Sequence, residues 1–208
     1  IIREFRRRLH QYTTHIPDED DNDELMALMQ HHGAPTRLLD FTYSPYVAAY
    51  FAFEYADAGS NSNVAIWAIN ASWCTEQLEK QYPDLKKPYE SYVKTRKRED
   101  FKRIFMPDRN IRKLVLSVNP FRLNERLAYQ KGVFLCPGDV RVPFMDNLSD
   151  FVGNDKMENK VVKFTIPTGD EGELRNDALN SLELMNINRI TLFPGLDGFA
   201  QSFSTRIF

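Results

Sequence analysis

The chain has 208 residues, 42% of them hydrophobic and 27% charged, and a formal net charge of −2. These proportions are typical of a soluble globular protein that is long enough to bury a sizeable core. No run approaches the roughly 18 apolar residues of a membrane span, so we expect no membrane contact. Cys74 and Cys136 lie far apart without metal-binding or disulfide spacing, which favours reduced, buried thiols in a cytoplasmic protein.

The first half of the chain shows clear helix and strand signals. Apolar and basic positions alternate at helical spacing over residues 1–10, and strong helix formers follow over 24–30. Asn22 or Asp23 is expected to cap the second helix, and Gly33 to end it. Residues 37–42 read as a short strand. Ser44 and Pro45 then begin a helix over 47–56, whose aromatic and alanine stripe is expected to lie in the core.

The second half alternates short strands with helices of unequal length. We expect mixed helix and loop over 70–110, and a helix over 171–184. The remaining expected elements are a buried strand at 64–69, strands at 114–118, 132–135 and 161–166, and a turn-rich segment at 192–198. This order indicates an α+β fold. We expect one domain over 1–208, with an N-terminal helix and acidic loop at 1–22 and a helical basic insertion at 70–110.

Charge is unevenly distributed along the chain. Six of the seven residues from Asp18 to Glu24 are acidic, whereas residues 86–113 contain eleven bases and four acids. We expect the acidic run to be a helix cap with a solvated face. The basic segment suggests an anionic partner, and its cations alternate with aromatic residues in a way that suits single-stranded nucleic acid. A solvated amphipathic helix that buries these aromatics explains the pattern equally well. The expected nucleic-acid contacts are Lys94, Arg96, Lys97, Arg98, Lys102 and Arg103.

Polar side chains that could take part in catalysis or ligand binding are concentrated at residues 30–45. This segment has the sequence Gln-His-His-Gly-Ala-Pro-Thr-Arg-Leu-Leu-Asp-Phe-Thr-Tyr-Ser-Pro. This segment closely resembles the central motif of FRG-domain proteins. Two later segments, at 125–134 and 192–198, fit the same family. The resemblance extends from residue 24 to about residue 200. The Phe/Tyr-Arg-Gly tripeptide that gives the family its name is absent, because Phe5-Arg6-Arg7 lacks the glycine.

The order of these motifs along the chain is similar to the order of motifs in ADP-ribosyltransferases. This resemblance is an analogy of motif order. The resemblance implies a mixed or split β-sheet core of that type with flanking helices, and NAD as co-substrate. Cleavage of NAD passes through an oxocarbenium-like state, so the site must hold the diphosphate, the ribose and the nicotinamide. The implied catalytic residues are Arg37, Thr42, Glu125 and Gln130. The implied NAD contacts are His32, Thr36, Arg37, Asp40, Thr42, Tyr43, Ser44, Tyr46 and Phe134.

Each of these residues also has a purely structural interpretation. Arg37 and Asp40 would form an ion pair, and Thr42 and Ser44 would cap the helix that follows. Gln130 is neutral where a standard transferase has a carboxylate, so Glu125 or Asp40 would have to supply one. His31 and His32 suit a helix C-terminus, and we expect no metal site because further ligands at suitable spacing are missing.

The resemblance implies a growth-inhibiting or phage-defence effector of a toxin–antitoxin type. It would transfer ADP-ribose to a macromolecule, with RNA or DNA as the favoured acceptor and an antitoxin protein as a neutralising partner. Three alternatives remain open at this point. They are an inactive module that binds a nucleotide or nucleic acid, a hydrolase or nuclease that uses His31 or His32 as a general base, and an interaction domain.

Overall fold

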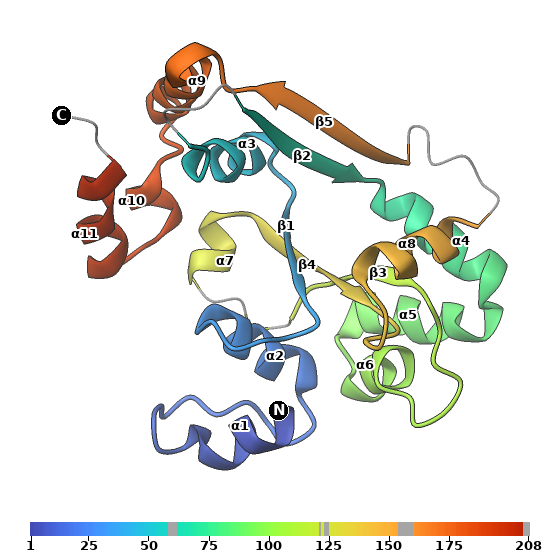
Figure 1. Ribbon diagram of the computed structural model, residues 1–208. Helices are drawn as coiled ribbons and strands as arrows, with labels where there is room; N and C mark the ends of the chain where they lie inside the picture. Colours follow the sequence, from blue (N-terminus) through green and yellow to red (C-terminus); the bar gives the residue numbers. More distant parts are fainter. Residues whose placement is uncertain (58–61, 121, 123–124, 154–159, 206–208) are drawn as a thin grey trace. The chain divides into compact units, whose positions relative to one another are not determined.

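The computed structural model describes residues 1–57, 62–120, 122, 125–153 and 160–205. The chain forms two compact units, which we describe separately. Unit 1 comprises residues 1–40, 70–122 and 134–156, and unit 2 comprises 41–69, 123–133 and 157–208. The expected α+β class is confirmed, since helices and small sheets are both present (Figure 1).

Unit 1 is mainly helical. Its helices are α1 (Ile2–Leu9), α2 (Asn22–His31), α4 (Ala71–Gln81), α5 (Pro83–Thr95), α6 (Arg98–Phe105) and α8 (Phe144–Val152). Strand β3 (Val115–Val118) pairs antiparallel with β4 (Gly132–Pro137), with Val115 opposite Pro137 and Val118 opposite Phe134. A three-stranded sheet has the order β1-β4-β3, in which β1 is Leu39–Thr42. The chain passes between the two units within β1 and within β4.

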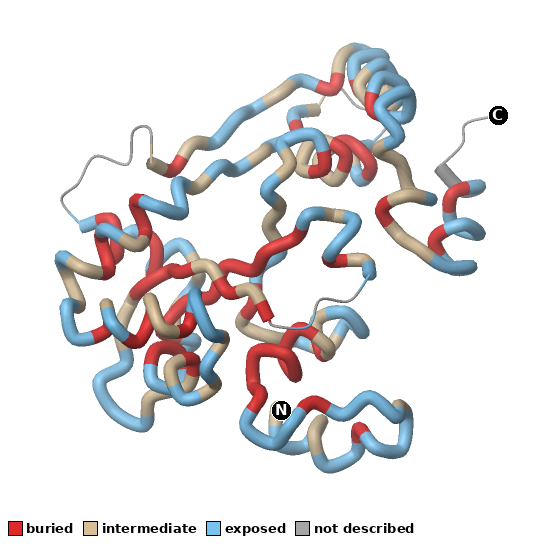
Figure 2. Tube along the Cα trace, turned by 180° about the vertical axis from the view of Figure 1, so that it is seen from behind, coloured by how far each residue is buried: buried red, intermediate tan, exposed pale blue. Residues whose placement is uncertain are grey.

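The core of unit 1 lies where the sequence carries its aromatic residues. Tyr92, Phe101, Phe105 and Phe151 are almost completely buried, and buried positions follow α2 and β4 (Figure 2). Strand β1 begins two residues later than expected. The hydroxyl of Thr36 accepts a hydrogen bond from the Leu38 amide at 3.0 Å. Arg37 and Leu38, the first two residues of the expected strand, therefore lie in a turn.

Unit 2 contains a two-stranded ribbon and several helices. Strands β2 (Asn63–Ile69) and β5 (Val161–Pro167) pair antiparallel, with Ile66 opposite Phe164. The helical elements are α3 (Pro45–Glu54), α7 (Glu125–Tyr129), a 3-10 turn at Asp170–Gly172, α9 (Glu173–Leu184), α10 (Arg189–Leu192) and α11 (Leu196–Thr205). As expected, Ser44 caps α3 by accepting from the Val47 amide, and Pro45 is its first residue.

Three burial expectations were wrong. Strand β2 is not a buried strand, since Trp67 is 41% exposed and most of its other residues are exposed or half-buried. In a two-stranded ribbon each strand has a single hydrogen-bonded neighbour, so much of both strands remains accessible. In α3 the buried residues are Val47, Tyr50, Phe53 and Glu54, whereas Tyr55, which belongs to the aromatic stripe expected in the core, is exposed. The third expectation, which is wrong for the second half of the acidic run, is described below.

Candidate functional site

A pocket in unit 1 lies beside the motif of residues 30–45. It has a volume of about 770 Å³ and is lined mostly by apolar side chains of α2, of the segment after α6, and of the segment after β4. Thr36 and Arg37 line it, and so does Arg3 of α1. The pocket therefore combines an apolar wall with two guanidinium-bearing side chains, which suits a ligand that has both rings and negative charge.

The loop that carries Arg37 is held by a network around Gln30. The hydroxyl of Thr36 donates to the side-chain oxygen of Gln30 at 2.5 Å. The Gln30 amide nitrogen donates to the Leu38 carbonyl and to the Asp40 carboxylate, both at 3.3 Å. Gly33 makes this loop possible by adopting a φ of 75° at the end of α2, a conformation that glycine tolerates better than other residues.

Arg37 and Asp40 do not form the ion pair that was one interpretation of their spacing. Arg37 donates instead to the backbone carbonyl of Phe105 at the end of α6, and Asp40 is exposed and accepts from Gln30. None of the ion pairs in the described part of the chain joins the two. The guanidinium of Arg37 is thus anchored at one edge, half-buried, on the wall of the pocket.

Neither cysteine is among the residues that line the pocket. Both thiols are free and buried, as expected. Burial raises the pKa of Cys136 to about 12, although the neighbouring Arg37 guanidinium acts in the opposite direction. Burial raises the pKa of Cys74 to about 12 as well. His31 ends α2 and His32 caps it, and both are exposed. The described residues contain no group of three or more His, Cys, Asp or Glu side chains that would hold a metal ion.

The end of the motif of residues 30–45 contacts the segment of residues 125–134 within unit 2. The hydroxyl of Thr42 donates to the backbone carbonyl of Gln130 at 2.7 Å and accepts from the Ser44 amide at 3.0 Å. The Tyr43 amide donates to the carbonyl of Lys131 at 3.0 Å. Ser44 therefore has the capping role that was considered, whereas Thr42 does not cap the helix and connects the strand to the Gln130 backbone instead. The rings of Tyr43 and Tyr46 are 66% and 54% exposed.

Gln130 connects this region to the C-terminal motif. Its side-chain amide donates to the Leu192 carbonyl at 3.0 Å. Next to it, the guanidinium groups of Arg126 and Arg189 lie 4.5 and 4.7 Å from the centre of the Phe193 ring, which is cation–π geometry. Three sequence motifs far apart in the chain are thereby joined within one unit.

Two other expected site residues have contrasting positions. Glu125 is the first residue of α7 and is exposed, so its carboxylate is accessible. Phe134 is only 3% exposed and lies in β4 opposite Val118, within the core of unit 1. Every residue of β4 is buried, so the Phe134 ring is not accessible to a ligand in this structure, and its contact with a cofactor stays a prediction.

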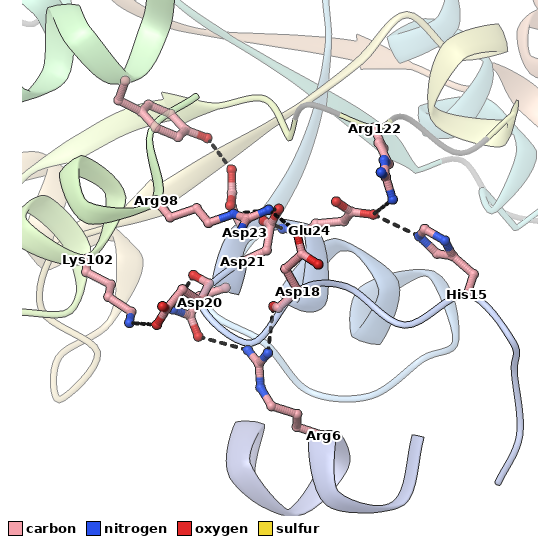
Figure 3. Close-up of polar contacts among 12 residues, drawn as sticks. Arg6, His15, Asp18, Asp20, Asp21, Asp23, Glu24, Arg98, Lys102 and Arg122 are labelled. Atoms are coloured by element: carbon pink, nitrogen blue, oxygen red, sulfur yellow. Dashed lines mark hydrogen bonds and ion pairs between the residues drawn. The ribbon is translucent and has the colours of Figure 1, made fainter. Parts of the chain in front are cut away.

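The acidic run and the basic segment pair with each other in unit 1 (Figure 3). Arg98 of α6 forms ion pairs with Asp18 and, at 3.3 Å, with Asp21, and Lys102 pairs with Asp20. Arg6 of α1 donates to the Asp18 carbonyl at 2.9 Å. Two of the six cations expected to contact nucleic acid are thus paired internally.

The remaining basic residues divide into two kinds. Arg96 folds back onto its own helix, where it donates to the Tyr92 carbonyl at 3.1 Å and covers the Tyr92 ring. Lys94, Lys97 and Arg103 are exposed. The aromatic residues between the charges are buried, as in the amphipathic-helix interpretation; they are Tyr89, Tyr92, Phe101 and Phe105. These rings belong to the core and are not available to stack on bases.

The acidic run is the expected solvated face only in its first half. Asp18, Glu19 and Asp20 are exposed, whereas Asp21, Asp23 and Glu24 are buried. The expected capping role is confirmed, since Asp21 caps α2 by accepting from the Glu24 amide at 3.2 Å. Asp23 accepts from the Tyr92 hydroxyl at 2.9 Å. Burial and the hydrogen bond with Asp21 raise the pKa of Asp23 to about 7. Glu24 contacts His15 at 2.8 Å and Arg122 at 3.9 Å.

Sequence reasoning missed a buried polar group in unit 2. Glu54 of α3 accepts from the Tyr50 hydroxyl at 2.8 Å and pairs with Arg189, although its side chain is only 3% exposed. Arg175 of α9 donates to the carbonyls of Phe53 and Glu54. A lone glutamate at the end of an apolar helix carries no sequence signal for such a role. The segment around Phe193 did carry a signal, because its resemblance to the family was noted. No role was assigned to it.

Comparison with known proteins gives one positive result. The FRG domain family model matches residues 1–61, which include α1, α2, the Gln30 network and the start of unit 2. The resemblance inferred from residues 30–45 is therefore confirmed over that part of the chain. No curated protein and no solved structure matches. Among the described residues, none of the helices has the length and apolar character needed to cross a membrane.

Proposed function

We propose that this FRG-domain chain binds NAD in the pocket of unit 1 and transfers ADP-ribose to a nucleic acid, as an effector in growth inhibition or phage defence. The observation that carries the proposal is the pocket itself. Arg3, Thr36 and Arg37 line an otherwise apolar space of about 770 Å³, and all three lie inside the segment that matches the family.

The chemistry of NAD fits this lining. Its diphosphate carries two negative charges, which the planar forks of Arg3 and Arg37 would bind through charge-assisted hydrogen bonds. Its rings need an apolar wall, and the accessible lining residues Met106, Ile111 and Val140 provide one. Because Arg37 is already anchored on the Phe105 carbonyl, its remaining N–H groups would be oriented before the ligand arrives.

The transfer step would require residues that respond to positive charge on the ribose. Glu125 carries the exposed carboxylate of the segment of residues 125–134, whereas Gln130 in the same segment is neutral. We propose Glu125 for charge stabilisation, and Thr42 and Gln130 for positioning the segment that carries it. These roles are assigned from motif order, and each is tested by its own substitution.

Calorimetry with NAD, ADP-ribose, ADP and nicotinamide tests the binding step. Charge-assisted hydrogen bonds contribute about 1.5–3 kcal/mol, so Arg37→Lys and Arg3→Gln should each weaken NAD binding by about 10- to 100-fold. Arg7→Gln is a matched control, since Arg7 lies on the same helix, is exposed and does not line the pocket. If Arg3→Gln and Arg7→Gln bind NAD equally well, the pocket is not the NAD site.

A second candidate function is an inactive nucleotide-binding module, and the geometry of Gln130 favours it. The Gln130 amide is occupied by the Leu192 carbonyl, so a catalytic role would first require this bond to break. NAD labelled in its adenosine part, incubated with RNA or DNA, separates the two functions. A transferase releases nicotinamide and labels the acceptor, and Glu125→Gln abolishes both events. A binding module binds NAD and does neither.

A further inference from the structure

The ion pairs between the acidic loop at residues 18–20 and helix α6 are exposed. The side chains of Arg98 and Asp18 are 36% and 69% accessible, and those of Lys102 and Asp20 are 44% and 63% accessible. Lys102 lowers the pKa of Asp20, so this carboxylate stays ionised at neutral pH. Ion pairs with this accessibility contribute little to stability, because water screens them and both side chains lose freedom.

The same loop is anchored at its C-terminal end. Asp21 caps α2, and Asp23 is buried against Tyr92. The backbone of the loop is held by hydrogen bonds that do not involve the exposed carboxylates. The Arg6 guanidinium donates to the Asp18 carbonyl, and the Asn22 side-chain amide donates to the Asp20 carbonyl. The loop therefore presents two carboxylates to α6 that are dispensable for its own conformation.

We propose that Asp18 and Asp20 act as an internal competitor for nucleic acid. They occupy Arg98 and Lys102 as two phosphate groups of a single strand would, and they withhold these two cations from an arbitrary strand. The proposal rests on the proposed nucleic-acid acceptor. The exposed cations Lys94, Lys97 and Arg103 make the first contact, and the two masked cations join it only when the acidic side chains leave.

The competition reduces non-specific binding. A protein that neutralises phosphates with all of its cations binds any polyanion, with an affinity that rises steeply at low salt. By masking two of five cations, the loop lowers the number of phosphates that an arbitrary strand can neutralise.

The test measures the affinity of the purified chain for a fluorescent oligouridylate over a range of salt concentrations. In the double variant Asp18→Asn/Asp20→Asn, Lys102 is freed to neutralise one further phosphate, and Arg98 neutralises a second where the strand outcompetes its remaining partner Asp21, which lies at 3.3 Å. The slope of log K against log[salt] should therefore steepen by about 0.7 to 1.4, at about 0.7 per phosphate for single strands. A steepening of about 1.4 corresponds to an additional gain in affinity of about 25-fold for each tenfold decrease in salt.

A charge-matched control separates this effect from a change in net charge. Asp177→Asn/Glu183→Gln removes two exposed acids from α9 of unit 2 and should leave the slope unchanged. Adding Arg98→Gln and Lys102→Gln to the Asp18→Asn/Asp20→Asn variant should return the slope to that of the wild type. An equal gain in both double variants, or a slope that stays the same after Asp18→Asn/Asp20→Asn, overturns the proposal.

The outcomes distinguish this proposal from the proposed function. If the wild type binds the oligonucleotide and the Asp18→Asn/Asp20→Asn variant binds it no more steeply, only the competitor role fails. If no variant binds it at any salt concentration, the nucleic-acid acceptor fails together with this proposal. NAD binding, measured by calorimetry on the same variants, should be unaffected in every case.

Discussion

Asp23→Asn is expected to stabilise the protein at neutral and alkaline pH and to remove most of a pH-dependent loss of stability. Burial and the hydrogen bond with Asp21 raise the pKa of Asp23 to about 7, which exceeds the ordinary aspartate value by about 3 units. The protonated carboxyl donates to Asp21 and accepts from the Tyr92 hydroxyl at 2.9 Å. Asparagine has nearly the same shape and provides both the donor and the acceptor.

The sign follows from proton uptake on folding. Between pH 4 and pH 7 Asp23 is protonated in the folded chain and ionised in the unfolded chain, so the folded state binds the extra proton. Stability contributed by this group is therefore complete below about pH 4 and is lost as the pH rises to about 7. At 1.36 kcal/mol per unit, a shift of about 3 units gives a loss on the order of 4 kcal/mol.

Urea unfolding of the wild type and of Asp23→Asn, measured from pH 4 to pH 8, tests this reasoning. The two free energies of unfolding should be similar near pH 4, and the variant should become progressively more stable towards pH 8. Asp20→Asn removes an exposed carboxylate from the same segment and should follow the wild-type profile. A constant difference between wild type and Asp23→Asn, or a variant that is less stable at pH 8, would refute the raised pKa.

Three further outcomes are expected. Thr42→Val should lower the free energy of unfolding by about 1–2 kcal/mol, because it leaves the Gln130 carbonyl without its donor, whereas Thr42→Ser should not; equal urea midpoints would contradict this. Gly33→Ala should cost about 1 kcal/mol in the same assay, because its φ of 75° strains any L side chain although the space is open, and an unchanged midpoint would argue against that conformation. Arg141 lowers the pKa of Asp139 to about 2. The ionised Asp139 carboxylate therefore stabilises the folded chain above about pH 4, and this stabilisation is lost as the pH falls towards 2. Asp139→Asn should flatten that acid limb, and an acid titration with the limb intact would exclude the role.

The local elements of the fold were predictable because their signals are local. The Ser44-Pro45 pair predicted where α3 begins, since a hydroxyl cap and a proline with fixed φ act within one turn. Apolar runs predicted the strands β2 to β5. The burial of β2 was not predictable, because it depends on how many strands pair with it. The cap of α2 was assigned one or two residues too late, since Asp21, Asn22 and Asp23 are all competent caps.

The candidate site was predictable in its residues and less so in their partners. Residues 30–45 were recognised as a unit, and that segment supplies the Gln30 network and three residues of the pocket lining, Pro35, Thr36 and Arg37. The rest of the lining comes from other segments and was not predicted. The pairing of Asp18 and Asp20 with α6 was missed, because the two segments were interpreted separately although their charges are opposite. Partners that lie some 80 residues away in the chain leave no periodicity at either end.

The contacts of Gln130 bear directly on whether unit 2 can catalyse transfer. A neutral amide that donates to Leu192 has no full charge to offer an oxocarbenium-like ribose, and its orientation is set by that bond. A carboxylate that stabilises the positive charge on the ribose must therefore come from a different residue. Glu125 lies in the same segment and its carboxylate is exposed. In a transferase, Glu125→Gln would lower kcat with little change in KM, whereas Gln130→Met would lower thermal stability first. The reverse pattern would identify Gln130 as the catalytic group and exclude the positioning role argued for it above.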